Sequence, residues 1–193
     1  MPGNHRPPRR LTAAIFALTL GLTPFAADAA AFRAADYAPM LAPVAPACVS
    51  SPFGPRILPN RPLAGTFHSG IDLPAPIGSP VSAVAPGNIL RIQRRGVGGL
   101  EVLIQHDGFI GVYSHLGLIA PIVADGRKAI YGGERFATVG RSGLTYGPHL
   151  YFGMIVNGRS VDPAPYLNLV PCGSAAAAIQ DGRIRPTRLF AQH

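Results

Sequence analysis

The sequence predicts a mainly β fold. Short runs rich in Val, Ile, Leu and Tyr alternate with clusters of Gly, Pro, Asn and Asp, which are the residues that turns between strands require. The 23 Gly and 21 Pro residues in a chain of 193 supply many such turns. Hydrophobic residues make up 48% of the chain and charged residues 13%, so a sizeable core is expected and a disordered chain is excluded. The length fits one globular domain.

The first thirty residues are set apart from this domain. Three arginines within residues 1–10 precede an apolar run over residues 11–25, and a small-residue sequence follows at residues 27–29. This order is typical of a secretory signal peptide. The apolar run is shorter than the ~20 residues of a membrane span. We therefore predict a cleaved signal peptide over residues 1–29 and export to the periplasm, the cell wall or the medium, with uncleaved anchoring as the alternative.

The remaining chain divides into three parts. Residues 30–47 are rich in Ala and Pro, which predicts an extended linker. The globular domain is expected over residues 48–172, and residues 173–193 form a basic C-terminal tail. The net charge of +8 favours an anionic partner such as the bacterial wall. Nucleic acid is not expected, because no long Lys/Arg run or nucleic-acid motif is present.

The only two cysteines, Cys48 and Cys172, bracket the predicted domain. Export places them in an oxidising compartment, where an even number of cysteines favours a disulfide. A disulfide between them would join the two ends of the domain. Two unpaired buried thiols are the alternative.

Six strands are predicted from the apolar runs and their flanking turns. They are Pro80–Val84, Asn88–Arg94, Leu100–His106, Gly111–His115, Arg135–Val139 and His149–Val156. In the last strand, side chains alternate between two faces, so Leu150, Phe152, Met154 and Val156 share a core face. His149 and Tyr151 then lie side by side on the opposite face.

Two histidines belong to a predicted hairpin. A turn over residues 107–110 would pair His106 with Gly111 and Val102 with His115, which places both histidines on one face at opposite ends. Both cannot then serve one compact site. We interpret His106, which lies beside the turn, as an ordinary buried and hydrogen-bonded histidine.

A further pair, His68 and Asp72, has the chemistry of a metal site. An imidazole nitrogen and a carboxylate oxygen are ordinary zinc ligands, and a catalytic zinc site needs three protein ligands and one open position. Taken alone, the pair is better explained by a local hydrogen bond in a turn, with Gly70 supplying an unusual backbone angle. A second motif, Gly147-Pro148-His149-Leu150-Tyr151-Phe152, favours the metal interpretation.

Together these motifs resemble the lysostaphin-like, LytM-type zinc endopeptidases of peptidase family M23, which cut peptide cross-links of bacterial peptidoglycan. The resemblance covers about residues 50–167. It is carried by Ser51-Pro-Phe-Gly-Pro-Arg56, His68-Ser-Gly-Ile-Asp72, Ile104-Gln-His106, Tyr113-Ser-His-Leu116, Gly147-Pro-His-Leu150 and Val161-Asp-Pro163. Their combination is far more specific than any one of them.

The resemblance implies a fold, a cofactor and roles for residues. The fold is a single lysostaphin-like domain with a groove over a large antiparallel sheet, and one zinc ion lies at the groove floor. His68 and Asp72 correspond to two metal ligands, and His115 and His149 to catalytic histidines. Tyr151 stands where the family's third ligand, a histidine, is expected. A phenol has a reference pKa of ~10 and must lose its proton to bind a metal, so weaker or altered zinc binding follows.

Three functions are compatible with these residues. The first is an exported zinc metalloendopeptidase that hydrolyses peptide bonds of peptidoglycan, with Tyr151 or water completing the metal site. The second is a catalytically degenerate domain that binds peptidoglycan or regulates a cell-wall hydrolase. The third is a secreted structural module. Arg56 is assigned a structural role, with binding of a substrate carboxylate as the alternative.

Overall fold

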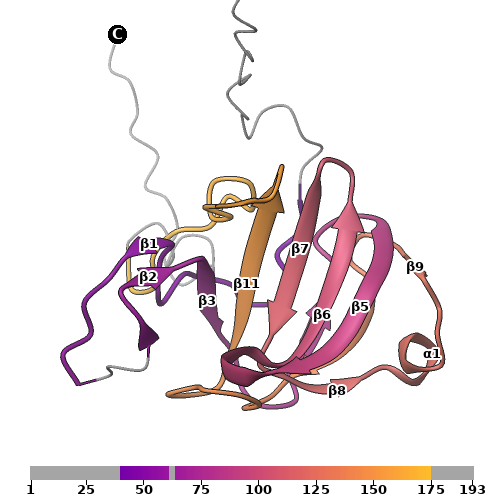
Figure 1. Ribbon diagram of the computed structural model, residues 1–193, viewed down its shortest axis with the longest axis horizontal. Coiled ribbons are helices and arrows are strands. Elements are labelled where there is room, and N and C mark those ends of the chain that lie inside the picture. Colours follow the sequence, from indigo (N-terminus) through magenta and orange to yellow (C-terminus); the bar gives the residue numbers. More distant parts are fainter. Residues whose placement is uncertain (1–39, 61–63, 175–193) are drawn as a thin grey trace, which may run out of the picture. The chain divides into compact units, whose positions relative to one another are not determined.

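Antiparallel strands dominate the computed structural model, which describes residues 40–60 and 64–174 (Figure 1). The largest sheet has seven strands in the order β12-β11-β7-β6-β5-β9, with β3 paired to β11. Its strands are β3 (Gly70–Pro74), β5 (Gly87–Arg95), β6 (Gly99–His106), β7 (Phe109–Ser114), β9 (Ala129–Ile130), β11 (His149–Val156) and β12 (Arg159–Val161). The mainly β fold class is therefore confirmed.

Smaller elements surround this sheet. A three-stranded sheet has the order β4-β10-β8, and a two-stranded ribbon pairs β1 with β2. These strands are β4 (Pro80–Ser82), β8 (Leu116–Ile119), β10 (Arg135–Val139), β1 (Gly54–Pro55) and β2 (Phe67–His68). A short helix α1 (Pro121–Ala124) and a 3-10 turn η3 (Gly96–Gly98) complete the described elements. None of the helices in residues 40–60 and 64–174 combines the length and apolar character that a bilayer crossing needs.

One face of the large sheet forms the core. Leu150, Phe152 and Met154 of β11 have no exposed surface, whereas His149 and Tyr151 are half-buried on the other face, as the alternation predicts. The rings of Tyr113 on β7 and Phe136 on β10 meet edge to face with centroids 5.0 Å apart. The core thus lies between the large sheet and the three-stranded sheet, and the polar face of β11 remains available for a site.

The hairpin of β6 and β7 differs from the prediction. His106 pairs with Phe109 and Val102 pairs with Tyr113, so only Asp107 and Gly108 form the turn. Gly108 has φ +76°, a conformation that glycine adopts without strain. The predicted four-residue turn was wrong, because it ignored the preference of an Asp-Gly pair for a two-residue connection.

The N-terminal boundary also lies earlier than predicted. Met40 and Val44, which the sequence assigns to a linker, are buried. The Leu41 N–H donates to the Val84 carbonyl at 2.8 Å, and the Ser82 N–H donates to the Pro43 carbonyl at 2.9 Å. Residues 40–47 are therefore part of the folded domain. The predicted signal peptide and nearly all of the predicted tail lie outside the described residues.

A disulfide joins Cys48 to Cys172 across 124 residues of sequence. Beside it, the Val49 N–H donates to the Val170 carbonyl at 2.9 Å and the Cys172 N–H donates to the Val49 carbonyl at 3.0 Å. In the chain-entropy description, a loop of this length stabilises the fold by about 4–5 kcal/mol. The two ends of the domain are thereby held together, as the cysteine spacing predicts.

Candidate metal and catalytic site

A groove of about 630 Å³ lies over the polar face of the large sheet. All five residues that the sequence singles out for chemistry line it: His68, Asp72, His115, His149 and Tyr151. They come from β2, β3 and β11 and from the end of β7. The fold thus brings together residues that are up to 83 positions apart in the sequence.

Strand pairing places several of these side chains in one row. Asp72 on β3 is directly opposite Tyr151 on β11, and Tyr151 is directly opposite Ser114 on β7. Directly opposed residues in antiparallel strands project from the same face. β3 was not among the predicted strands, because its five residues include Gly70, Asp72 and Pro74, which strands usually disfavour.

Asp72 lies between two imidazoles. Its Oδ1 atom is 3.2 Å from the Nε2 atom of His68 and 3.4 Å from the Nε2 atom of His149. Burial alone would raise the pKa of Asp72, but hydrogen bonds that His149 and His68 donate to the carboxylate when Nε2 is protonated outweigh burial and hold that pKa well below its usual range. Burial likewise lowers the pKa of His149, and the hydrogen bond and negative charge of Asp72 reverse this, so the pKa of His149 is raised.

The second nitrogen of each groove histidine faces a backbone carbonyl. The Nδ1 atoms lie 3.0 Å from the Pro52 oxygen for His68, 2.9 Å from the Ser142 oxygen for His115 and 2.8 Å from the Gly147 oxygen for His149. A carbonyl only accepts hydrogen bonds, so each Nδ1 atom is assigned the proton and each neutral ring has its lone pair on Nε2.

For His68 and His149, that lone pair faces a carboxylate oxygen, which is also an acceptor. Two acceptors at this distance repel each other unless a cation, either a proton or a metal ion, lies between or beside them. An imidazole that donates its other N–H to a backbone carbonyl is also the usual arrangement of a metal-bound histidine. The tautomers of the groove histidines therefore fit a cation site.

His115 adopts an unusual backbone conformation, because the chain leaves β7 at this residue with φ +63°. A left-handed conformation is strained for a residue other than glycine, and two hydrogen bonds hold it. The His115 N–H donates to the Gly98 carbonyl at 2.9 Å, and the His115 carbonyl accepts from the Gly140 N–H at 3.0 Å. The turn brings the ring edge to face against His149, with centroids 4.7 Å apart. Burial lowers the pKa of His115.

Tyr151 lies along the sheet surface, over two glycines. A Cβ atom on Gly70 would be 2.7 Å from the Tyr151 ring, and one on Gly153 would be 3.0 Å from its hydroxyl oxygen. The hydroxyl lies 2.9 Å from the Ser69 Oγ atom. Burial raises the pKa of Tyr151, which favours the protonated phenol. Gly70 and Gly153 therefore make the space that this tyrosine occupies.

The donors present fit a metal ion only in part. Zinc–ligand distances of about 2.0–2.1 Å and tetrahedral angles place two ligand atoms about 3.3 Å apart, which agrees with the 3.2 Å between His68 Nε2 and Asp72 Oδ1. Within residues 40–60 and 64–174, however, no group of three or more His, Cys, Asp or Glu side chains is arranged to hold a metal ion. A third ligand would have to be Tyr151, a repositioned His149 or water.

Sequence reasoning missed Glu101, a carboxylate that is only 2% exposed and lines the groove. Its Oε1 atom accepts a hydrogen bond from Ser114 Oγ at 2.8 Å, and its Oε2 atom accepts from Gln93 Nε2 at 2.9 Å. The signal was available in the alternation of β6, where Glu101 and Gln105 share the face opposite to Val102 and Ile104.

Two other predicted residues have structural contacts. The Arg56 guanidinium donates from Nη1 to Ser51 Oγ at 3.1 Å and from Nη2 to the Ala64 carbonyl at 2.7 Å. His106 lies outside the groove, where its Nδ1 atom faces the Pro86 carbonyl at 3.0 Å. These contacts favour the structural interpretation of both residues.

Comparison with known sequences gives a consistent result. The profile described as peptidase family M23 matches residues 66–163. The DD-carboxypeptidase/endopeptidase Mpg of Neisseria meningitidis serogroup B is 38% identical over 139 residues, which cover 68% of this chain and 31% of that protein. The peptidoglycan DD-endopeptidase ShyA of Vibrio cholerae is 35% identical over 115 residues, covering 59% of this chain and 26% of that protein. The chain thus spans between a quarter and a third of the length of these relatives.

Solved structures have the same fold. A zinc-containing peptidase from Vibrio cholerae superposes with a TM-score of 0.54 at 29% identity, covering 62% of this chain and 37% of that one. The catalytic domain of the antimicrobial peptidase lysostaphin from Staphylococcus simulans superposes with a TM-score of 0.54 at 28% identity, covering 62% of this chain and 90% of that one. The lysostaphin-like fold expected from the sequence is confirmed.

Proposed function

Because the chain belongs to peptidase family M23, we propose that it is an exported zinc-dependent endopeptidase that hydrolyses peptide bonds of bacterial peptidoglycan. One observation carries this proposal: His68 Nε2 and Asp72 Oδ1, two acceptor atoms in the groove, lie 3.2 Å apart, as the ligands of one cation do. The name of the relative ShyA supports peptidoglycan as the substrate. The disulfide supports a location outside the cytoplasm, where such bonds persist.

His68 Nε2 and Asp72 Oδ1 would hold the zinc ion, and Tyr151 or solvent would complete its ligands. When bound, zinc supplies a Lewis acid that polarises a scissile carbonyl and lowers the pKa of water toward neutrality. The carbonyls of Pro52 and Gly147 orient the imidazoles of His68 and His149. His115 and His149, which touch edge to face, can accept a proton at Nε2 or donate a hydrogen bond to the developing oxyanion.

The test combines zinc analysis of the purified protein with digestion of peptidoglycan sacculi, followed by mass spectrometry of the released peptides. We expect about one zinc per chain and the release of peptides with newly formed termini. His68→Ala should abolish both. Zinc retained at full stoichiometry in His68→Ala, or intact sacculi in the presence of zinc-loaded protein, contradicts the proposal.

A second function is favoured by one observation: among the described residues, no group of three or more His, Cys, Asp or Glu side chains is arranged to hold a metal ion. In this alternative, the groove binds peptidoglycan or regulates a cell-wall hydrolase without cutting a bond itself. Zinc absent from the native protein but present in Tyr151→His would favour it. His149→Ala also separates the two functions, because an enzyme loses its effect on the wall and a binding domain retains it.

A further inference from the structure

We propose that Arg95 determines specificity by binding a carboxylate of the peptide substrate at the rim of the groove, and that the buried carboxylate of Glu101 positions it. This inference rests on the proposed function, because it assumes that a wall peptide enters the groove. Arg95 and Glu101 both line the groove, yet neither belongs to the metal and histidine cluster.

Glu101 is built into the sheet as a charged anchor. Burying a carboxylate is costly unless hydrogen bonds satisfy it, and three donors do so here. Ser114 and Gln93 supply two of them, and the Arg95 Nε–H supplies the third at 3.1 Å from Oε2. The carboxylate packs directly against η3, since a Cβ atom on Gly98 would lie 1.9 Å from its Oε1 atom. Packing against η3 and three hydrogen bonds therefore hold the Glu101 carboxylate in place beneath Arg95.

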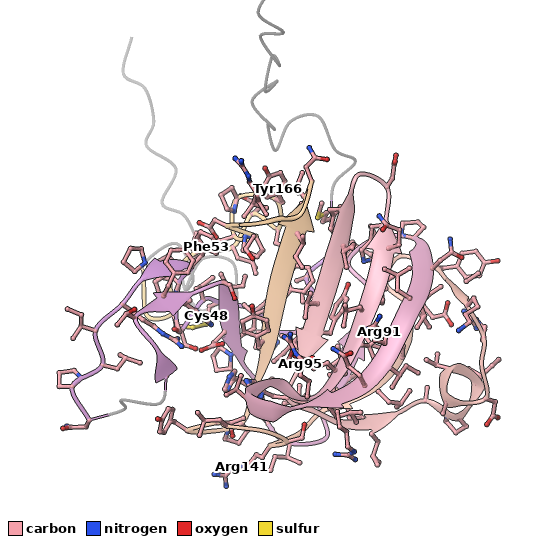
Figure 2. All side chains as sticks on the ribbon, viewed as in Figure 1. Cys48, Phe53, Arg91, Arg95, Arg141 and Tyr166 are labelled. Carbon is pink, nitrogen blue, oxygen red and sulfur yellow. A yellow bond between two sulfur atoms is a disulfide. The ribbon has the colours of Figure 1, made fainter. Side chains whose placement is uncertain are left out.

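Arg95 is exposed although its partner is buried. Its side chain is 69% exposed, compared with 2% for Glu101. The contact with Glu101 uses the Nε atom, and the two terminal nitrogens make no hydrogen bond to any part of the chain that the structure describes. Figure 2 shows Arg95 toward the lower ends of β6 and β7. One edge of the guanidinium thus contacts Glu101, and the terminal N–H groups stay exposed on a residue that lines the groove.

A comparison with Arg56 shows why Arg95 is the better ligand for substrate. Both arginines line the groove. Arg56 uses both terminal nitrogens for Ser51 and Ala64, so that its fork is occupied by the protein itself. The contact of Arg95 with Glu101 uses only Nε, so the two terminal nitrogens remain available for a ligand. A planar pair of N–H donors matches the two oxygens of a carboxylate, and such charge-assisted contacts are stronger than neutral ones.

Neighbouring Arg94 provides a matched control. It is an exposed arginine of the same strand, but alternation places it on the opposite face from Gln93 and Arg95, and it does not line the groove. Substitution of Arg94 changes the net charge of the protein by the same amount as substitution of Arg95. Any difference between the two variants therefore reports the groove contact and not the overall charge.

The experiment measures hydrolysis of a soluble cross-linked muropeptide dimer by the zinc-loaded full chain. The dimer is offered with free α-carboxylates on its peptides or with the same carboxylates amidated, and binding of each form is also measured by calorimetry. We expect the native protein to prefer the acid form, by about tenfold or more in kcat/KM and in affinity. Arg95→Gln should remove this preference, and Arg94→Gln should retain it.

Two further variants separate recognition from structural support. Arg95→Lys keeps the charge but not the fork, so it should restore little of the preference. Glu101→Gln keeps an acceptor but removes the charge that holds Arg95, and it should weaken the preference without changing the binding of the amidated dimer. Thermal unfolding of each variant establishes that it is folded at the assay temperature.

The outcomes are distinguishable. Equal binding of the acid and amide forms by the native protein, or full preference in Arg95→Gln or Arg95→Lys, overturns this inference and leaves the proposed function standing. Failure to bind or cut either form overturns the proposed function, and with it the inference. Loss of preference in Arg94→Gln as well would assign the effect to overall charge, which also overturns the role of Arg95.

Discussion

His106 and the groove histidine His68 use the same anchor and differ in what their second nitrogen meets. Each has its Nδ1 atom 3.0 Å from a backbone carbonyl, of Pro86 and Pro52 respectively. The Nε2 atom of His106 lies 3.3 Å from the Tyr113 hydroxyl, and that hydroxyl accepts the Val84 N–H at 3.0 Å. Tyr113 therefore donates to His106, and every group in this core cluster is satisfied.

In the groove, the Nε2 atom of His68 meets a carboxylate instead of a hydroxyl donor. The core cluster is complete within the protein, whereas the groove needs a proton or a metal ion from outside. Burial and a carbonyl anchor therefore do not distinguish a structural histidine from a proposed metal ligand. The chemical nature of the group opposite the second nitrogen does.

The largest expected effect is on zinc affinity, when the carboxylate opposite His68 is replaced by a group that can donate a hydrogen bond, as Tyr113 does to His106 in the core. Asp72→Asn replaces a carboxylate oxygen by an amide that can donate to a histidine Nε2 atom. We expect zinc affinity to fall by more than 100-fold, since loss of a direct ligand exceeds the 10–100-fold effect of groups that only orient ligands. Zinc titration with a competing chelator measures this. Asp107→Asn, in the exposed β6–β7 turn, is the matched control; an equal loss there would remove the distinction between the two regions.

The next effect breaks the core cluster. Tyr113→Phe removes the donor to His106 and the acceptor of the Val84 N–H, and Tyr113 is fully buried. Leaving two buried groups unsatisfied should lower the free energy of unfolding by about 2–4 kcal/mol. Urea denaturation measures this change, and zinc content should stay that of the native protein. A loss of zinc with unchanged stability would show that the two regions are not separate.

A smaller effect sharpens the role of Tyr151. Tyr151→His places an imidazole opposite Asp72, in space that Gly70 and Gly153 already leave open for a larger ring. We expect zinc affinity to rise by about tenfold or more, because a neutral imidazole binds zinc without losing a proton at pH 7. Tyr131→His, at a residue that is 75% exposed, is the control for an added histidine. Unchanged affinity in Tyr151→His would mean that this position does not reach the metal.

The sequence predicted the strands well where hydrophobic alternation was regular. The strands Arg135–Val139 and His149–Val156 have the expected bounds, and the two faces of β11 are as expected. β3 was missed because Gly70, Asp72 and Pro74, which strands usually disfavour, interrupt the hydrophobic pattern. The backbone reversal at His115 has no signal in a single sequence, since it depends on Gly98 and Gly140, which are distant in the chain.

For the site as well, sequence patterns predicted some features, and others depended on contacts between distant residues. Motif spacing identified the residues that gather in the groove, but spacing alone does not reveal hydrogen-bond partners. Alternation in β6 gives the face on which Glu101 lies, but a lone acidic residue in a strand is usually interpreted as solvent-exposed. Its burial among Ser114, Gln93 and Arg95 follows only from the three-dimensional structure. Tautomers likewise follow from carbonyl positions that no sequence pattern contains.

The smallest expected effect is a pH dependence of stability that separates the two regions. Burial lowers the pKa of His106 below 6.5, and its contacts are the Pro86 carbonyl, the Tyr113 hydroxyl and the stacked Phe109 ring, none of them charged. The unfolded chain therefore binds the proton more readily, so the contribution of His106 is present above pH 6.5 and is lost as pH falls below it. The slope from one such group is at most about 1.4 kcal/mol per pH unit.

The groove histidines contribute less to this slope. Burial gives His115 a contribution of the same sign, and Asp72 gives His149 one of the opposite sign, so the two contributions partly cancel. Urea denaturation of the zinc-free protein between pH 5 and 8 should show a positive slope that is reduced in His106→Gln. If the slope is not reduced in His106→Gln, the acid sensitivity comes from the groove histidines. The description of the core cluster as complete within the protein would then be wrong.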